Sequence, residues 1–389
     1  MTDHEADMFT DYAAAAARYR HWITAAALPF WATDGRDERH GGSIERVEAD
    51  GSVDFTVPTR VRVQARQLFV YAVADEYGCY ADAPSVSADL WQFLESHCRC
   101  QQRAGYGHTL VWPDGINDSR LDLYDHAFYL LATAWYYRTQ RELIAKERAN
   151  AIVAMLDATL AHSSGGWLEG DYDAPWRRQN PHMHLFEAFM AWFEATEEEQ
   201  WLDRASAMYA LFERVFFDAD HGVVLEYFRT DWSRPDDPAD NAAEPGHLLE
   251  WVWLLDWYQR LTGVDTEAMQ VRLYETAIGA GLNKGVMIDT LNVDASPREQ
   301  TRRLWPMTEY IKASCVRYSR GDTAALQHAT HAITALLGQF QLSVAGTYVD
   351  RLDAKNVVID ARSPASSMYH LMAAFVEINR LGEFTLPPR

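Results

Sequence analysis

Apolar and aromatic side chains recur along this chain every three to four residues, which is the spacing of one face of an α-helix. Gly, Pro and Asp residues interrupt the pattern and divide it into segments of helical length. Twelve helices are predicted, over residues 6–29, 58–78, 85–103, 122–140, 142–162, 180–197, 199–217, 245–262, 265–281, 303–320, 322–341 and 364–381. The pattern therefore predicts an all-α protein.

The connections between these helices alternate in length. Each even-numbered helix is followed by a short connection, and each odd-numbered helix by a longer one. Four of the longer connections hold a strand-like piece, at residues 107–112, 166–170, 223–228 and 346–349. A helical hairpin and a loop thus repeat about every sixty residues. Six such units predict an (α/α)6 barrel, a toroid with the even helices inside and the odd helices outside, and we expect one catalytic domain over residues 1–389.

Two features of the even-numbered helices favour a closed ring. Residues 248–255 and 371–375 are almost continuously apolar, as expected for helices that are covered on all sides. Prolines at or near the first turn suit a helix start, because the N–H that proline lacks has no partner there; they are Pro58, Pro181, Pro245 and Pro364. The alternative is an open superhelix of helical pairs, a noncatalytic binding scaffold. That fold does not explain why reactive side chains gather at the same end of each inner helix.

The starts of the six inner helices carry polar side chains, and in a toroid all six starts surround one mouth. In chain order they are Arg62 and Arg66; Tyr124 and His126; Asn180, His184 and Glu187; His247 and Glu250; Trp305 and Glu309; and His370. Imidazole can both accept and donate a proton near neutral pH. Several histidines around one cavity therefore predict proton-transfer chemistry.

The spacing of these residues suggests how the histidines are oriented. His184 and Glu187 are three residues apart, as are His247 and Glu250, so each pair lies on one helix face. Each carboxylate can then accept the Nδ1–H of its histidine and fix the tautomer. His182 points to a different face from His184, and we interpret His182, like His126, as structural. Trp305 is a candidate for stacking on the apolar face of a sugar.

Other kinds of chemistry fit the sequence less well. Two His-x-x-Glu segments resemble carboxylate-bridged metal clusters, but the expected order is Glu-x-x-His, so we expect no metal. Paired carboxylates could support glycoside hydrolysis, although the excess of histidines is unusual for that reaction; the candidates are Asp122, Asp125, Glu187 and Glu250. The chain contains no Gly-rich phosphate loop or dinucleotide fingerprint, and we expect no cofactor.

Charge and composition limit the partners. The chain has 35 Lys and Arg against 56 Asp and Glu, a net charge of −21, which disfavours nucleic acids and anionic membranes and makes a neutral small molecule the easier partner. The four cysteines form no CxxC pair, and the acidic N-terminal segment does not resemble a signal peptide. No segment is apolar for long enough to span a bilayer. We expect a cytoplasmic protein, and the sequence gives no indication of its oligomeric state.

Six motifs, in order along almost the whole chain, resemble the N-acylglucosamine 2-epimerase superfamily, which includes mannose isomerases, other aldose-ketose isomerases and cellobiose 2-epimerases. The motifs are Val63–Ala72, Leu123–Phe128, Asn180–Glu187, Glu244–Trp251, Leu304–Glu309 and Tyr369–His370. The resemblance implies an (α/α)6 barrel and cofactor-independent chemistry at C1 and C2 of a reducing sugar. It also implies that Arg66 binds substrate oxygens, that Tyr124 belongs to the site and that His370 is catalytic.

The expected mechanism is proton transfer through an enediolate. His247 and His370 are the expected acid/base pair, and His184, held near Asn180, would help to open the sugar ring. Arg66 would stabilise the enediolate oxygens. The expected substrate-binding residues are Arg66, Tyr124, Asn180, Glu187, Glu250, Trp305 and Glu309.

The reaction and the sugar stay open at this point. One base working on one face gives an isomerisation, and two bases on opposite faces give a 2-epimerisation. Compact loops favour the conversion of D-mannose to D-fructose, with a 2-epimerase as the alternative and a glycoside hydrolase or a noncatalytic scaffold more distant. The loop over residues 230–241 is rich in Asp and Pro, which favours an uncharged monosaccharide.

Overall fold

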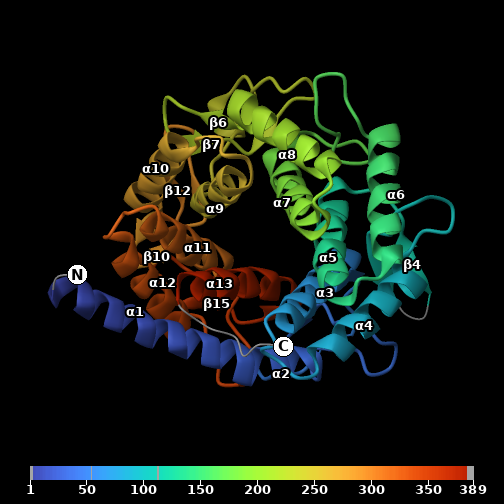
Figure 1. The fold of residues 1–389 in the computed structure, drawn as a ribbon, viewed down its shortest axis with the longest axis horizontal. Coiled ribbons are helices and arrows are strands. Elements are labelled where there is room, and N and C mark those ends of the chain that lie inside the picture. Colours follow the sequence, from blue (N-terminus) through green and yellow to red (C-terminus); the bar gives the residue numbers. More distant parts are fainter. Residues whose placement is uncertain (1–2, 54, 112–113, 383–389) are drawn as a thin grey trace.

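Six inner helices surround a common axis (Figure 1). They are α3 (Val61–Glu76), α5 (Leu123–Gln140), α7 (Gln179–Thr196), α9 (Pro245–Thr262), α11 (Trp305–Ser319) and α13 (Met368–Leu381). Each packs against the next, and α13 packs against α3, so the ring is closed. This computed structural model describes residues 3–53, 55–111 and 114–382. The predicted (α/α)6 barrel is therefore confirmed.

A second layer of helices lies outside this ring (Figure 1). Its members are α1 (Asp3–Trp22), α4 (Ala83–Phe93), α6 (Leu143–Thr159), α8 (Glu199–Leu211), α10 (Glu267–Thr276) and α12 (Ala325–Gln339). From α4 to α12, each outer helix packs against the inner helix that precedes it. Helix α1 packs against α12, and its buried Tyr19 donates a hydrogen bond of 2.8 Å to the carbonyl of Leu371 in α13. The helix at the start of the chain thereby contacts α12 and α13, which lie near the end of the chain.

Four outer helices end in a single wide π-helical turn before the chain crosses back to the inner ring. These turns are Ile23–Ala27, which leads into α2 (Leu28–Ala32), and Leu94–Cys98, Phe212–Phe216 and Ala277–Gly281. The predicted outer helices included most of these turns as ordinary helix, because a π turn keeps the same apolar face as the α-helix it extends.

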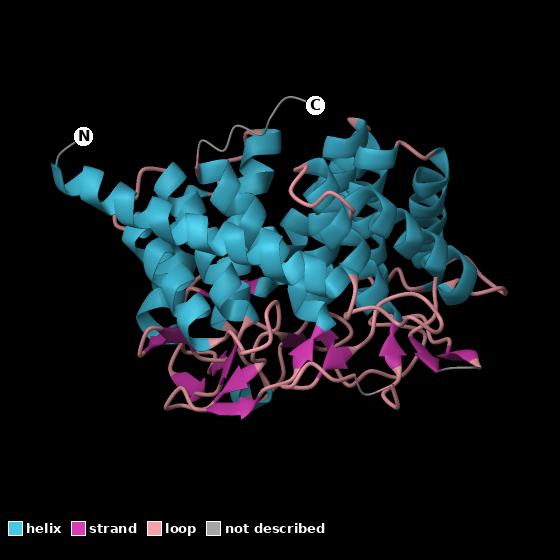
Figure 2. Ribbon diagram, turned by 90° about the horizontal axis from the view of Figure 1, so that it is seen from below, coloured by secondary structure: helices cyan, strands magenta, loops and turns pink. Residues whose placement is uncertain are grey.

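All the short strands lie at one end of the ring (Figure 2). They are β1 (Arg46–Val47), β2 (Thr59–Arg60), β3 (Thr109–Val111), β4 (Gly115–Asp118), β5 (Arg177–Arg178), β6 (Phe217–Asp218), β7 (Val223–Val224), β8 (Tyr227–Phe228), β9 (Leu282–Asn283), β10 (Val286–Met287), β11 (Thr290–Leu291), β12 (Pro297–Glu299), β13 (Arg302–Arg303), β14 (Arg351–Leu352), β15 (Val358–Asp360) and β16 (Ser363–Pro364). Antiparallel pairs join loops of neighbouring hairpins, as β5 pairs with β8 and β13 with β14. The loops that precede the inner helices are thus tied to one another.

The predicted strand-like pieces are only partly confirmed. Strand β3 lies inside residues 107–112, although Trp112 is outside the described residues, and β7 and β8 lie inside 223–228. Residues 166–170 and 346–349 form only isolated bridges, Ala161 with Trp167 and Gln341 with Tyr348 among them. Those two predictions of strand were wrong because Trp167, Gly170 and Tyr348 each pair as single residues and the pairings do not continue into a ladder.

Two buried histidines hold loops against the starts of inner helices. The Nδ1–H of His126 donates to the carbonyl of Asp122, while Nε2 accepts the N–H of Tyr106 at 3.1 Å. His182 makes the same contacts one hairpin later, with the carbonyl of Arg178 and the N–H of Trp167. Both imidazoles are fully buried, in keeping with the structural role expected for them.

The inner and outer rings pack through aromatic side chains, as expected from the many tryptophans. Trp192 of α7 stacks on Trp201 of α8, with ring centroids 5.3 Å apart. Trp251 of α9 stacks on Phe212, where the centroids are 4.1 Å apart. Among the described residues, the helices are too short or too polar for any of them to cross a membrane.

Candidate active site

A polar cavity of about 280 Å³ opens at the strand-bearing end of the ring. Its lining residues come from all six inner helices or from the loops just before them. They are Arg60, Arg66, Tyr124, Asn180, His184, Glu244, His247, Glu250, Arg303, Trp305, Asp350, Pro364, Ser366, Ser367 and His370. The structure thus brings most of the predicted site residues together on one cavity wall.

Glu187 and Glu309 are the two predicted substrate-binding residues that do not line this cavity. Both are buried one layer behind it, each against a histidine that does. The Nδ1–H of His184 donates to Glu187 Oε2 at 3.0 Å, and the Nδ1–H of His370 donates to Glu309 Oε1 at 2.9 Å. The predicted pairing of Glu187 with His184 is thus found, whereas the prediction that Glu187 and Glu309 bind substrate is corrected, because both carboxylates orient imidazoles and do not line the cavity.

His247 has a different carboxylate partner from the one predicted. Its Nδ1–H donates to Glu226 Oε1 at 2.7 Å, and Glu226 comes from the segment between β7 and β8. The predicted partner, Glu250, makes no hydrogen bond to it within the described part of the chain. The prediction was wrong because helix spacing considers only α9, whereas the loop places a second carboxylate closer. Sequence analysis missed Glu226, whose only signal was an acidic residue inside an apolar strand-like piece.

Glu226 and its neighbours favour the charged form of His247. Burial alone would disfavour the imidazolium, but the charges of Glu226 and Glu244 raise the pKa of His247 to about 9. On the opposite side of the ring, His247 Nε2 lies 3.1 Å from the amide nitrogen of Asn180. A flip of the Asn180 amide exchanges its nitrogen and oxygen, so the oxygen can equally accept an Nε2–H from His247. His247 is therefore an imidazolium near neutral pH.

His370 has the opposite protonation state. Burial, together with the nearby charges of Arg66 and Lys312, lowers the pKa of His370 well below its usual range. Its Nδ1–H is held by Glu309, which leaves Nε2 as the unprotonated nitrogen. His370 is consequently a neutral imidazole with one basic nitrogen available.

Trp305 lies between these two histidines. Its ring centroid is 5.0 Å from that of His247 and 5.4 Å from that of His370. Both imidazoles are tilted by roughly the same angle from the indole plane, 36° and 35°. The indole is therefore a flat apolar surface beside both the cationic and the neutral imidazole.

His184 is neutral and is held in a more apolar part of the wall. Burial lowers the pKa of His184 to about 3, and the ring packs 4.4 Å from the centroid of Phe128. Burial also raises the pKa of its partner Glu187 to about 7, and Tyr369 donates to the same carboxylate at 2.7 Å. Asn180 was expected beside His184, but the structure places its amide against His247 instead.

Arg66 is fixed by contacts on several sides. It donates to the hydroxyl of Tyr124 at 2.7 Å and to the carbonyl of Ser366 at 3.2 Å. Its guanidinium also lies 4.0 Å from the ring centroid of Phe128. The group is thus pre-oriented in the wall with no carboxylate hydrogen-bonded to it among the residues described, and its positive charge is available to a ligand.

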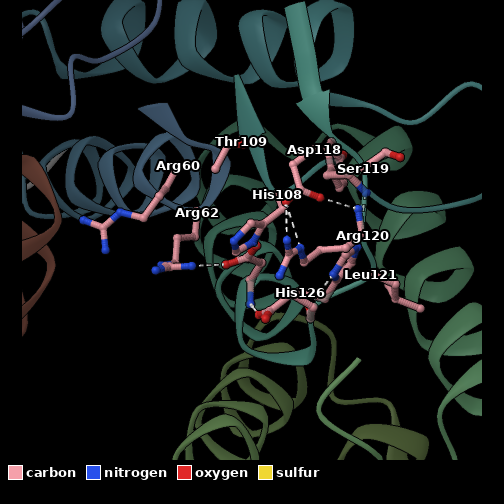
Figure 3. A network of polar contacts seen from close by, with 12 residues as sticks. Arg60, Arg62, His108, Thr109, Asp118, Ser119, Arg120, Leu121 and His126 are labelled. Carbon is pink, nitrogen blue, oxygen red and sulfur yellow. Dashed lines mark hydrogen bonds and ion pairs between the residues drawn. The ribbon is translucent and has the colours of Figure 1, made fainter. Parts of the chain in front are cut away.

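Arg62, predicted beside Arg66 at the mouth, belongs to a neighbouring network instead. Arg62 NH1 lies 2.7 Å from Asp125 Oδ1, and His108 Nδ1 lies 2.6 Å from the other oxygen of the same carboxylate. Figure 3 shows Arg62 and His108 close together in this network. The burial of Asp125 is thereby compensated, and this cluster lies outside the cavity lining.

Four charged residues of the cavity wall were not selected from the sequence: Arg60, Glu244, Arg303 and Asp350. Arg303 donates to Glu244 Oε2 at 2.7 Å and to Asp289 at 3.0 Å. Arg60 is paired in the same way with Glu45. These two arginines come from short strands before inner helices, where residue type alone gives no sign that the loops will fold over the mouth. Because carboxylates neutralise both of them, the wall is polar without being strongly positive.

Three groups of side chains in the described structure have donor atoms close enough to hold a cation; His108 with Asp122 and Asp125 lies in the network of Arg62, and the two at the cavity are His184 with Glu187 and Glu250, and Glu250 with Glu309 and His370. In both groups the histidine Nδ1 is already hydrogen-bonded to a glutamate. The ammonium of Lys312 also lies 2.5 Å from Glu309 and 4.0 Å from Glu250, so a metal ion would be repelled by an existing charge. The donor sets therefore suit an internal ion-pair cluster better than a metal.

The wall as a whole can move a proton to and from carbon. His370 carries an unprotonated nitrogen, His247 carries a proton on each nitrogen, and Arg66 adds a fixed positive charge; such a set could take up and give back a proton and stabilise an anion with two adjacent oxygens. Glu250 also lines the cavity, and neither of its oxygens has a hydrogen-bond partner in the described structure. A hydroxylated ligand would supply donors for that carboxylate.

Comparison with known proteins places this geometry in a family. A family model described as N-acylglucosamine 2-epimerase matches residues 42–374. The chain is 32% identical to the mannose-6-phosphate isomerase of Rhizobium meliloti over 92% of this chain and 95% of the relative. It is 28% identical to the D-mannose isomerase of Thermobifida fusca, over 81% and 82% of the two chains. The structure of cellobiose 2-epimerase from Bacillus thermoamylovorans superimposes with a TM-score of 0.86 at 19% identity, covering 94% of this chain and 99% of that one.

Proposed function

Because the chain belongs to the N-acylglucosamine 2-epimerase family and is an enzyme of the isomerase class, we propose that it converts D-mannose to D-fructose. Relatives of similar length are named as mannose isomerases, a mannose-6-phosphate isomerase and a cellobiose 2-epimerase, which supports isomerisation or epimerisation of a sugar. We further propose that residues 1–389 form one catalytic domain. The observation that carries the proposal is the pair of imidazoles in different charge states, neutral His370 and cationic His247, that both lie against Trp305.

In this proposal His370 is the base. The open-chain aldose lies against Trp305, and His370 Nε2 removes the proton from C2. The electron pair moves into a double bond between C1 and C2 while O1 takes up negative charge, so a cis-enediolate forms. The imidazolium of His247 and the guanidinium of Arg66 stabilise its oxygens, because both are positively charged and already fixed in place. A proton then passes from O2 to O1 and the carbonyl forms at C2, while His370 returns the carbon-bound proton to C1, which gives the ketose.

The remaining wall residues bind and position the sugar. Glu250 accepts hydrogen bonds from sugar hydroxyls, and Tyr124 and Asn180 keep Arg66 and His247 in place. His184 is a neutral imidazole whose Nε2 is free to assist opening of the sugar ring. Each of these roles follows from a contact of the side chain with the cavity or with a residue that lines it.

A 2-epimerase is the second candidate function. The imidazolium of His247 stands across Trp305 from His370, so it could deliver a proton to the opposite face of C2. The proton would then return to the same carbon with inverted configuration, and the product would be an aldose. Which carbon is reprotonated distinguishes the two reactions.

The charge of the wall supports an uncharged sugar over a sugar phosphate. The wall contains Arg60, Arg66 and Arg303, but also Glu244, Glu250 and Asp350. The ion pairs of Arg60 and Arg303 already use the charges that a phosphate would need. A phosphorylated substrate would have to displace those carboxylates.

The substrate is tested by incubating the protein separately with D-mannose, mannose 6-phosphate, D-glucose, N-acetylglucosamine and cellobiose, and identifying the products by NMR. We expect fructose from mannose, and a lower kcat/KM with mannose 6-phosphate. Conversion of mannose to glucose alone would favour the epimerase. A strong preference for mannose 6-phosphate would contradict the assignment of an uncharged substrate.

A further inference from the structure

A lysine is buried beneath the cavity, where none was expected. Lys312 lies on the inner helix α11, one turn after Glu309, and its side chain is 0% exposed. Its ammonium lies 2.5 Å from Glu309 Oε2, 4.0 Å from Glu250 Oε1 and 3.7 Å from the ring centroid of Trp253. A buried ammonium is costly unless opposite charge surrounds it, so this position demands an explanation.

Stability alone does not explain the lysine. A buried ion pair adds little net stability compared with apolar side chains of similar volume, because both charges lose their hydration. The methionine side chain would fill similar space among the apolar residues of α11. The lysine therefore points to a role for its charge.

Lys312 and His370 hold the two oxygens of one carboxylate. Glu309 Oε2 faces the ammonium of Lys312, whereas Glu309 Oε1 accepts the Nδ1–H of His370 at 2.9 Å. The three side chains thus form a continuous row from the buried floor of the barrel to the cavity wall. A proton on Glu309 would weaken Oε1 as the acceptor that fixes the tautomer of His370, and a proton on Oε1 itself would replace that acceptor with a donor.

Glu309 needs a nearby cation to stay ionised. Burial and the charge of Glu250 raise the pKa of Glu309 to about 8 even with Lys312 in place; the ammonium opposes that shift and so favours the carboxylate. The charged and titratable groups around the ammonium come from four inner helices; they are His184 and Glu187 of α7, Glu250 of α9, Glu309 of α11 and His370 of α13. Lys312 thus brings positive charge into a floor that holds three buried carboxylates.

We propose that Lys312 is a positioning residue for proton transfer: its ammonium keeps Glu309 as a carboxylate, and Glu309 keeps His370 with Nε2 free for the substrate. Lys312 does not line the cavity, and we assign its action to Glu309 because that carboxylate, at 2.5 Å, is nearer to the ammonium than Glu250 at 4.0 Å. The inference rests on the proposed function in so far as His370 is the base. Its structural half, the control of the His370 tautomer, can be observed without any sugar.

The kinetic test compares Lys312→Met, which removes the charge at similar volume, with Lys312→Arg and with the exposed control Lys355→Met. We expect Lys312→Met to lower kcat by about tenfold or more at pH 7 while KM changes little. Without the ammonium Glu309 takes up a proton at higher pH, so the acid limb of the kcat profile should move upward by about one pH unit or more. In Lys312→Arg and Lys355→Met, the acid limb of the kcat profile should lie at the same pH as in the unmodified enzyme. An unmoved limb in Lys312→Met would overturn the proposal.

A second pair of variants tests the proposal without relying on Lys312→Met alone. If Lys312 acts through Glu309, the double variant Glu309→Gln/Lys312→Met should have the same kcat as Glu309→Gln alone. It also removes both charges of the pair, which a buried site tolerates better than the loss of one. A further loss of kcat in the double variant, as large as that caused by Lys312→Met alone, would show an independent role and contradict the proposal.

Nitrogen-15 NMR of the histidine side chains, without sugar, separates this inference from the proposed function. The unmodified protein should show His370 protonated at Nδ1, and Lys312→Met should show a changed tautomer at the same pH. Failure of the unmodified protein to convert any sugar would count against the proposed function alone. An unchanged His370 tautomer in Lys312→Met would overturn the role of the lysine.

Discussion

The two histidines that flank Trp305 differ in charge because different groups surround them. His247 lies against Glu226 and near Glu244, and these carboxylates favour the imidazolium despite burial. His370 has one carboxylate partner, Glu309, whose charge is shared with Lys312, and positive charges nearby favour the neutral ring. Environments that separate the pKa values of two similar groups are how proteins create an acid and a base from one residue type.

This explanation predicts the effect of removing the carboxylate beside His247. Replacing Glu226 with Gln should lower the pKa of His247 from about 9 and move the alkaline limb of kcat/KM to lower pH. The sign follows because His247 acts as the imidazolium, which is present below its pKa and lost above it. The limb is measured from initial rates between pH 6 and pH 10.

Glu213→Gln is the matched control, since Glu213 is exposed on the turn that follows α8. Its profile should superimpose on that of the unmodified enzyme. If Glu226→Gln left the alkaline limb in place, His247 would not be the group that limits activity at high pH.

At this scale the sequence predicted which residues meet, but not how they pair. The motifs selected His184, His247 and His370, and all three line one cavity. The partnership of His247 with Glu226 depends on the path of a loop, which helical spacing cannot describe. Lys312 was missed for a related reason: a lysine in a helix normally reaches solvent, and its burial is visible only when the inner ring is assembled.

At the scale of elements, the inner helices are held at their first turns by the loops that precede them. His126 and His182 repeat one arrangement in consecutive hairpins, in which a buried imidazole joins the helix start to a loop N–H. The residue before each loop N–H is a glycine with positive φ, Gly105 at +101° and Gly166 at +63°. A side chain there would strike the imidazole.

Substitution of Gly166 tests this arrangement. A Cβ at Gly166 would lie 2.8 Å from His182 Nε2, and the left-handed backbone adds strain, so Gly166→Ala should lower the free energy of unfolding by about 2–4 kcal/mol. Gly263→Ala is the control, because Gly263 also has positive φ but nothing lies within 4 Å of its added Cβ. The control should cost only about 1 kcal/mol.

Both variants are compared by urea unfolding monitored by circular dichroism. Equal losses of stability in the two variants would mean that the contact between the loop and His182 does not constrain the fold.

The helices themselves were predictable because their periodicity is local in sequence. The isolated bridges at 161–167 and 341–348 were not, since one pairing depends on which loops the closed ring brings together.

At the scale of the whole molecule, the candidate active site lies at one end of the ring of helices. The long loops and short strands lie at one end, where the inner helices begin, and the cavity opens there (Figure 2). Closure of the ring brings residues as distant in sequence as Arg66 and Ser366 into contact. The six-fold repeat was predictable from the sequence, because each hairpin has the same order of short and long connections.

The most direct test of the account is the rate of proton transfer with and without His370. Unmodified enzyme and His370→Asn are each incubated with D-mannose in deuterated water, and the mannose H2 and fructose H1 signals are followed by NMR. His370→Asn should be roughly 10²-fold slower or more, with unchanged circular dichroism, because a positioned base contributes about that factor. Conversion by His370→Asn within about threefold of the unmodified rate would contradict the assignment of His370 as the base.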